Sequence, residues 1–274
     1  MLARIRRLVT PYMPTDDAPR TAFGGFEAGL LIVASVGLTV MQFGGAESVF
    51  LDWFGPTLKA DAISQLEPPP EAVELFGASA HRFYSLLSLA HWVFFCVLGY
   101  VIIPVLYLKF MGRRLQDYYI GFDGFLSHSK IYLVLFLLVI LPVIGVSFSK
   151  EYQSIYPFYS AASRSVFDLV AWELLYGIQF VALEFFFRGF LLAGLKKWIG
   201  YGAVFVMLMP YCMLHFMKTG SESLGAIIAG VILGTLAMKY RSIWGGAMIH
   251  WAVAISMDVL SLLQKGELPT RLWP

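Results

Sequence analysis

The sequence contains few charged residues for a chain of its length. Only 14% of its 274 residues are charged and 58% are hydrophobic, whereas charged residues make up about 25% of an average soluble protein. The mean hydropathy is +0.71, and the formal net charge of +2 gives no sign of a nucleic-acid partner. No polar stretch is long enough to fold as a second domain. The composition therefore predicts one membrane domain whose main partner is the lipid bilayer.

Residue patterns typical of several other chemistries are also missing. The sequence has two cysteines, Cys96 and Cys212, and both fall in apolar runs, so it predicts no disulfide framework. It contains neither the His-Glu-x-x-His pattern of zinc proteases nor the Gly-x-Ser-x-Gly pattern of serine hydrolases. We therefore expect no bound metal ion and no cofactor.

About seven apolar stretches are long enough to cross a bilayer, which takes roughly 20 helical residues. This pattern predicts an all-α, polytopic membrane helix bundle. The fourth stretch is longer than the hydrocarbon core, so we expect it to tilt, bend or project into the cytoplasm. Gly177 and Gly189 are the expected sites of this change. Gly230 and Gly234 belong to a stripe of small residues that predicts close helix packing. The predicted spans are 23–45, 83–108, 131–147, 166–197, 199–217, 223–239 and 243–263.

The basic residues predict how the chain crosses the membrane. Arginines and lysines gather before the first predicted span and after the second, fourth and sixth, whereas residues 46–81 are acidic. Cytoplasmic segments of membrane proteins are enriched in lysine and arginine. We therefore expect residues 1–22 in the cytoplasm and residues 46–81 outside, in a multi-pass protein of the cell (inner) membrane. The sequence does not predict an oligomeric state.

Ionisable side chains lie inside these apolar stretches. Glu184 and Arg188 fall in the fourth stretch, His215 in the fifth and His250 in the seventh. A charged group in hydrocarbon is costly unless it is paired or hydrated, so ionisable residues within the membrane are candidates for function. Glu and Arg four residues apart can pair on one helix face, and a carboxylate with two imidazoles can transfer protons. These four residues therefore form a candidate catalytic set.

Counting along the chain predicts which of these residues share a depth. We treat the fourth and fifth stretches as an antiparallel hairpin that turns near Trp198. Glu184 and His215 then lie roughly 21 and 25 Å from the turn at 1.5 Å per residue. Arg188 and Tyr211 form a second level, and Tyr211 shares a helix face with His215. Tyr211 is therefore a candidate supporting residue.

Two residues of the seventh stretch extend this set. His250 follows the turn near Arg241, which puts it at a slightly shallower depth but within reach of Glu184. Asp258 lies about two turns further on the same side of the helix, and it is a second candidate supporting residue. A purely structural Glu184–Arg188 ion pair, and histidines that only make structural hydrogen bonds, remain alternatives.

The pattern of these residues resembles three motifs of one family. The segment Leu183 to Gly189 reads Leu-Glu-Phe-Phe-Phe-Arg-Gly, Tyr211 to His215 reads Tyr-Cys-Met-Leu-His, and His250 to Ala254 reads His-Trp-Ala-Val-Ala. They are similar to Glu-Glu-x-x-x-Arg, Phe-x-x-x-His and His-x-x-x-Asn/Asp of the CPBP family. That family includes CAAX-type prenyl-protein endopeptidases, bacteriocin-processing proteins and glutamic-type intramembrane proteases. The resemblance covers about residues 165–263.

The sequence departs from the family pattern at three positions. Leu183 replaces the first Glu, which the family generally uses to activate water, and Tyr211 is a mild replacement for Phe. Ala254 replaces the Asn or Asp that the family uses to stabilise the oxyanion, and Asp258, one turn further, could substitute for it. Either Glu184 has taken over the role of base, or the chain has lost proteolysis and kept the scaffold.

The resemblance implies an intramembrane endopeptidase that cleaves a membrane-associated protein or peptide, either by CAAX-type processing or at a sorting signal or leader. We expect Glu184 to take over the role of the missing Glu as general base, acting on a water held with His215. The resemblance further implies that His250 stabilises the oxyanion and that Arg188 orients the carboxylate. We divide the chain accordingly into a cytoplasmic segment, N-terminal spans and loops, a catalytic core and a C-terminal tail, at 1–22, 23–164, 165–263 and 264–274.

Two other classes of function remain open. Because the first motif carries Leu183 instead of Glu, the chain could be a catalytically inactive scaffold or chaperone of a secretion or sorting system. His215 and His250 could also act as paired imidazole ligands of a haem, in which case the purified protein would absorb visible light. A colourless preparation would count against the haem.

Overall fold

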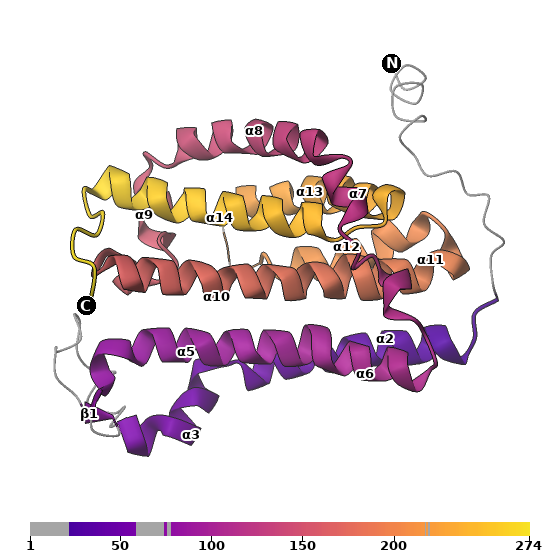
Figure 1. The fold of residues 1–274 in the computed structure, drawn as a ribbon, viewed down its shortest axis with the longest axis horizontal. Helices are drawn as coiled ribbons and strands as arrows, with labels where there is room; N and C mark the ends of the chain where they lie inside the picture. Colours follow the sequence, from indigo (N-terminus) through magenta and orange to yellow (C-terminus); the bar gives the residue numbers. More distant parts are fainter. Residues whose placement is uncertain (1–21, 59–73, 76–77, 217, 219) are drawn as a thin grey trace. The chain divides into compact units, whose positions relative to one another are not determined.

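The computed structural model describes residues 22–58, 74–75, 78–216, 218 and 220–274. The described part is almost entirely helical (Figure 1), which confirms the predicted all-α class. Of the predicted cytoplasmic segment 1–22, residues 1–21 lie outside the described residues.

The helices and strands follow one another along the chain, and those labelled η are π-helical (η2, η3, η6) or 3₁₀-helical (η4, η5). In order they are α2 (Gly25–Thr39), η2 (Val40–Gly44), α3 (Glu47–Leu58), β1 (Glu74–Leu75), β2 (Ala78–Ser79), α5 (Ala80–Val97), η3 (Leu98–Ile102), α6 (Ile103–Phe110), η4 (Leu115–Tyr118), α7 (Asp123–Leu126), α8 (Ser129–Val146), α9 (Lys150–Ile155), η5 (Ser160–Ser163), α10 (Val166–Glu184), η6 (Phe185–Leu192), α11 (Ala193–Ile199), α12 (Gly202–Met213), α13 (Gly220–Tyr240) and α14 (Trp244–Lys265). The two strands form a short antiparallel pair.

Six helical segments in the described part of the chain are long and apolar enough to span a bilayer, and each coincides with a predicted span. They are Gly25–Gly44, Phe83–Phe110, Ser129–Val146, Val166–Ile199, Glu222–Tyr240 and Trp244–Lys265. A seventh apolar helix, α12, is shorter. The prediction of a polytopic bundle of about seven membrane helices is confirmed, and the protein is a multi-pass integral membrane protein.

Two details of the spans differ from the prediction. The fifth span was expected over 199–217, but α12 ends at Met213 and His215 lies in the turn that follows. In the long fourth span, the regular α-helix changes to the π-helical stretch η6, which contains Gly189. Gly177, the other predicted site, stays inside the regular helix α10. A Cβ at Gly177 would lie 2.6 Å from the ring of Trp251, so this glycine is needed for close packing.

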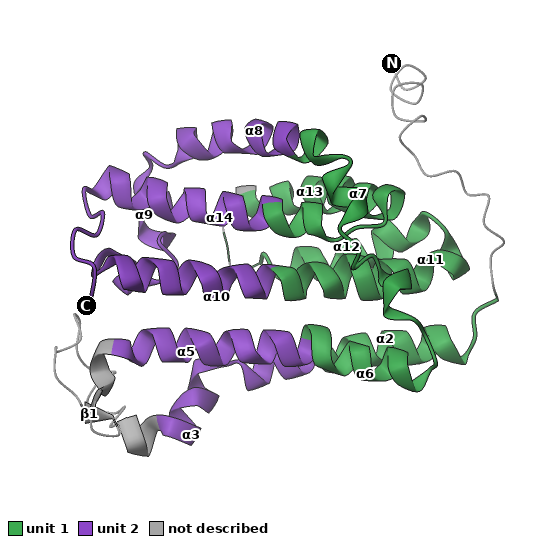
Figure 2. Cartoon of the chain, in the orientation of Figure 1, with its two compact units in different colours: residues 1–37, 100–132, 181–248 green, residues 38–99, 133–180, 249–274 purple. Residues whose placement is uncertain are grey.

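The chain forms two compact units, which Figure 2 shows in different colours. Unit 1 consists of residues 1–37, 100–132 and 181–248, and unit 2 of residues 38–99, 133–180 and 249–274. Because the divisions fall inside α2, η3, α8, α10 and α14, these helices each contribute to both units.

The core of unit 1 is built around η6. The rings of Phe186, Phe187 and Phe190 are fully buried, and Phe186 packs against Tyr100 with ring centroids 4.8 Å apart. The small residues of α13 bring this helix against α12. A Cβ at Gly234 would lie 3.0 Å from Met207, and one at Gly230 would overlap Leu208. The close packing predicted from the small-residue stripe is therefore confirmed at these two glycines.

Unit 2 contains a column of aromatic rings along α10. Trp172, Tyr176 and Phe180 follow one another at a spacing of one helical turn, with ring centroids 4.6 and 4.4 Å apart. Phe158 stacks on Trp172 at 5.6 Å. Such contacts between aromatic rings stabilise a helix more than their area alone implies, so they support α10 from Trp172 to Phe180.

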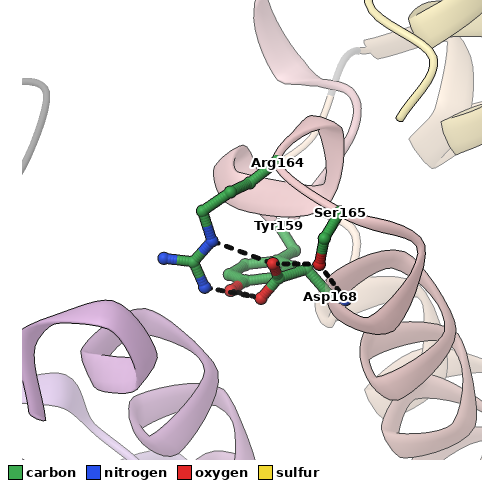
Figure 3. A network of polar contacts seen from close by, with 4 residues as sticks. All are labelled: Tyr159, Arg164, Ser165 and Asp168. Atoms are coloured by element: carbon green, nitrogen blue, oxygen red, sulfur yellow. Dashed lines mark hydrogen bonds and ion pairs between the residues drawn. The ribbon is translucent and has the colours of Figure 1, made fainter. Parts of the chain in front are cut away.

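A polar network fixes the start of α10, and Figure 3 shows three side chains converging on the carboxylate of a fourth residue, Asp168. Asp168 accepts hydrogen bonds from Arg164 Nε at 2.8 Å and Nη2 at 2.6 Å. It also accepts them from Ser165 Oγ at 2.7 Å and the Tyr159 hydroxyl at 3.0 Å. Burial, and then the Asp168 carboxylate, raise the pKa of the Tyr159 hydroxyl. An acidic side chain in the first turn of a helix is favourable, so the network is an anchor for α10.

Candidate functional site

Glu184 and Arg188 form a buried ion pair in unit 1. Glu184 is the last residue of α10, and Arg188 lies in η6. Arg188 Nη1 is 2.9 Å from Glu184 Oε1, and the two side chains are 0% and 1% exposed, respectively. A buried charge is tolerated only when a close partner compensates for the loss of water. The pair therefore fixes the carboxyl group of Glu184 and the guanidinium of Arg188 relative to each other.

A π-helical stretch, η6, starts next to Glu184 and contains Arg188. η6 begins immediately after Glu184, and all eight of its residues, Phe185 to Leu192, are buried. π-helical turns are rare and occur frequently at functional sites, because the wider turn redirects side chains. Two other π-helical stretches, η2 and η3, lie in the first and second spans, and η6 is the one that holds an ionisable residue of the candidate site, Arg188.

Arg188 connects the pair to the second motif. Its guanidinium carbon lies 4.2 Å from the centre of the Tyr211 ring on α12, an arrangement in which the cation interacts with the face of the ring. The Tyr211 ring in turn lies 5.1 Å from the His215 ring. These contacts agree with the levels counted from Trp198, which predicted that Arg188 lies beside Tyr211 and that Tyr211 shares a face with His215.

His215 is held by the backbone around it. Its Nδ1 lies 3.1 Å from the carbonyl oxygen of Tyr211, and Ser223 Oγ donates a hydrogen bond of 2.8 Å to the carbonyl of His215. A carbonyl only accepts, so Nδ1 carries the hydrogen and Nε2 of the neutral ring presents a lone pair. Ser223 was not a predicted site residue, and the sequence carries no signal for it because it lies in the next helix, α13.

The carboxylate of Glu184 packs directly on the first turn of α14. A Cβ at Gly246 would overlap Glu184 Oε2, so only glycine leaves room for the carboxylate there. Gly246 lies one helical turn before His250 on α14. The third motif therefore starts one turn after the residue that accommodates Glu184. Gly246 is a second site residue that the prediction missed, since a glycine in an apolar run is typical of helix packing in general.

The other predicted residues lie in unit 2. The His250 ring stacks on Phe180, with centroids 5.5 Å apart. Asp258 is fully buried and accepts hydrogen bonds from Trp172 Nε1 at 2.8 Å and from the backbone nitrogen of Phe158 at 3.3 Å. These bonds favour a structural role for Asp258 over the predicted supporting role in catalysis. Ala254 belongs to the same buried cluster as Trp172.

The first motif position carries an apolar residue, and this residue is buried. Leu183 is 7% exposed. Within the described residues, no group of three or more His, Cys, Asp and Glu side chains is arranged to hold a metal ion. The chemistry available in unit 1 is thus a carboxylate that can accept a proton, a guanidinium that fixes it, and an imidazole that can hold a water.

The comparison with known proteins agrees with the motifs. Residues 165–256 match the family model described as type II CAAX prenyl endopeptidase Rce1-like. No curated protein and no solved structure matches the chain. The matched region contains all three motifs, so the resemblance to CAAX-type proteases is confirmed over this part of the chain. The match to this family supports a function of the CAAX-type intramembrane endopeptidase class.

Proposed function

We propose that the protein is an intramembrane endopeptidase in which Glu184 and His215 activate a water molecule. The observation that carries this proposal is the buried Glu184–Arg188 pair, at 2.9 Å, which contacts Tyr211 and through it His215. A membrane helix gains nothing in hydrophobic stability from such a pair. Its position inside the region that matches the Rce1-like family model makes peptide hydrolysis the reaction that best accounts for it.

The proposed mechanism follows from what each side chain can do. Glu184 takes a proton from the water, which His215 Nε2 holds by accepting its other hydrogen. The water oxygen attacks the peptide carbonyl carbon, and the carbonyl oxygen becomes an oxyanion that His250 stabilises through an N–H group. The C–N bond then breaks, and Glu184 returns the proton to the departing amine. Arg188, 2.9 Å from Glu184, orients the carboxyl group in this sequence of proton transfers.

The substrate in this proposal is a membrane-associated protein or peptide. It would be cut near its C-terminus, as in CAAX processing, or at a leader or sorting signal. The name of the matched family favours the first of these two. Bilayer lipids are the other partner that the proposal requires, because apolar helices surround the site.

The test is processing of a prenylated CAAX reporter peptide in membranes. Glu184→Gln removes the base and His215→Ala removes the group that holds the water, so each should lower the rate at least about 10²-fold. Glu151→Gln is the matched control, since Glu151 is exposed on α9 and outside the site. Full processing by both site variants would contradict the proposal.

One observation favours a second candidate function. Leu183 occupies the first motif position and is buried, so this position offers no second carboxylate. An inactive scaffold or chaperone of a secretion or sorting system would have this feature. Leu183→Glu separates the two candidates: a variant that gains proteolysis from an inert parent would support the scaffold. A parent that already cleaves would exclude it.

A further inference from the structure

Tyr132 is buried in unit 1, although it belongs to the N-terminal part of the chain and lies outside the region that matches the family model. It is the fourth residue of α8, and its side chain is 4% exposed. Its hydroxyl oxygen is fully enclosed, and no described residue makes a hydrogen bond with it. Buried tyrosine hydroxyls usually find a partner, so this one has hydrogen-bonding capacity that the fold itself does not use.

The ring of Tyr132 and the candidate catalytic carboxylate pack on neighbouring residues of α14. A Cβ at Gly245 would overlap the Tyr132 ring near its hydroxyl-bearing carbon, and a Cβ at the next residue, Gly246, would overlap Glu184 Oε2. Two consecutive glycines of α14 therefore accommodate the Tyr132 ring and the Glu184 carboxylate.

The third motif lacks the group that would donate to the oxyanion. Ala254 stands where the family pattern has Asn or Asp, and the hydrogen bonds of Asp258 go to Trp172 and Phe158. His250 alone would then face the negative charge that forms in the transition state. A neutral phenol is a good donor, and tyrosine hydroxyls are among the groups that stabilise such oxyanions.

We propose that Tyr132 is a further catalytic residue, whose hydroxyl donates a hydrogen bond to the oxyanion formed when the water attacks the peptide carbonyl. This inference rests on the proposed endopeptidase function. The hydroxyl keeps its proton throughout, so Tyr132 neither replaces Glu184 as base nor forms a covalent bond with the substrate. Its unused hydrogen-bonding capacity in the resting protein is the feature expected of a preorganised oxyanion donor.

The test is Tyr132→Phe, which removes only the hydroxyl and keeps the ring that packs on Gly245. With a prenylated CAAX peptide in proteoliposomes, loss of one oxyanion donor should lower kcat by about 10²–10³-fold and leave KM nearly unchanged. Tyr119→Phe is the matched control, because Tyr119 is equally buried in unit 1 but lies in the loop after η4. A variant with the kcat of the wild type would overturn the inference.

A binding measurement distinguishes a wrong role for Tyr132 from a wrong assignment of the endopeptidase function. A peptide phosphonate, which carries a tetrahedral anion, should bind the wild type at least about 10²-fold more tightly than it binds Tyr132→Phe. An uncleavable peptide of the same sequence should bind both equally. If the wild type cleaves but the two proteins bind the phosphonate alike, only the role of Tyr132 is wrong. If the wild type neither cleaves the peptide nor binds the phosphonate, the endopeptidase function is wrong and the inference falls with it.

Discussion

At the scale of single residues, the position of Glu184 depends on Gly246. Gly246→Ala would place a methyl group where Glu184 Oε2 lies, so the carboxylate must move. A displacement of about 1 Å can cost 10²-fold in rate, and we expect a loss of this order in the reporter assay. Gly225→Ala is the control, because a Cβ at Gly225 meets nothing within 4 Å. Equal rates for the two variants would show that the carboxylate does not need its observed position.

The sequence could identify the charged residues of the site but not the residues that accommodate them. Glu184 and Arg188 are conspicuous because ionised groups are rare in apolar helices. Gly246 and Tyr132 are not, since glycine and tyrosine are ordinary in membrane helices. Their significance comes from contacts of α14 with α8 and α10, which are distant from it in sequence.

At the scale of elements, the hydrogen bond between Trp172 and Asp258 joins α10 to α14 within unit 2. Trp172→Phe keeps an aromatic ring for the stack with Tyr176 but leaves the buried carboxylate without its indole donor. We expect a loss of about 1–3 kcal/mol of stability, measured as a lower melting temperature in detergent. Trp53→Phe is the control because Trp53 is exposed, and surface substitutions usually change stability by less than about 0.5 kcal/mol. Identical melting temperatures would contradict a structural role for this bond.

The limits of the helices were only partly predictable. Hydropathy locates long apolar segments well because a bilayer demands about 20 such residues, and the predicted spans agree with the structure. Hydropathy does not predict the residue at which a helix ends. α12 ends at Met213 within an apolar run, and the bond from Ser223 to the carbonyl of His215 belongs to the turn that follows. The π-helical form of η6 has no sequence signature of its own either.

At the scale of the whole molecule, the distribution of basic residues predicts the orientation in the membrane. Asp52 and Arg114 are both exposed, and they should lie on opposite sides of the bilayer. In intact cells, a membrane-impermeant maleimide should label Asp52→Cys and leave Arg114→Cys unlabelled until the membrane is opened. The parent protein, with its native Cys96 and Cys212, gives the background. The reverse pattern would invert the predicted topology.

The most direct test of the endopeptidase function does not require a known substrate. The N- and C-termini of all membrane proteins can be compared by mass spectrometry in cells with the wild-type gene, with the gene deleted, and with Glu184→Gln in its place. If Glu184 activates the water, the deletion and the Glu184→Gln cells should accumulate the same unprocessed termini, which would identify the substrate. Termini that are unchanged in both strains would contradict proteolysis and favour the scaffold.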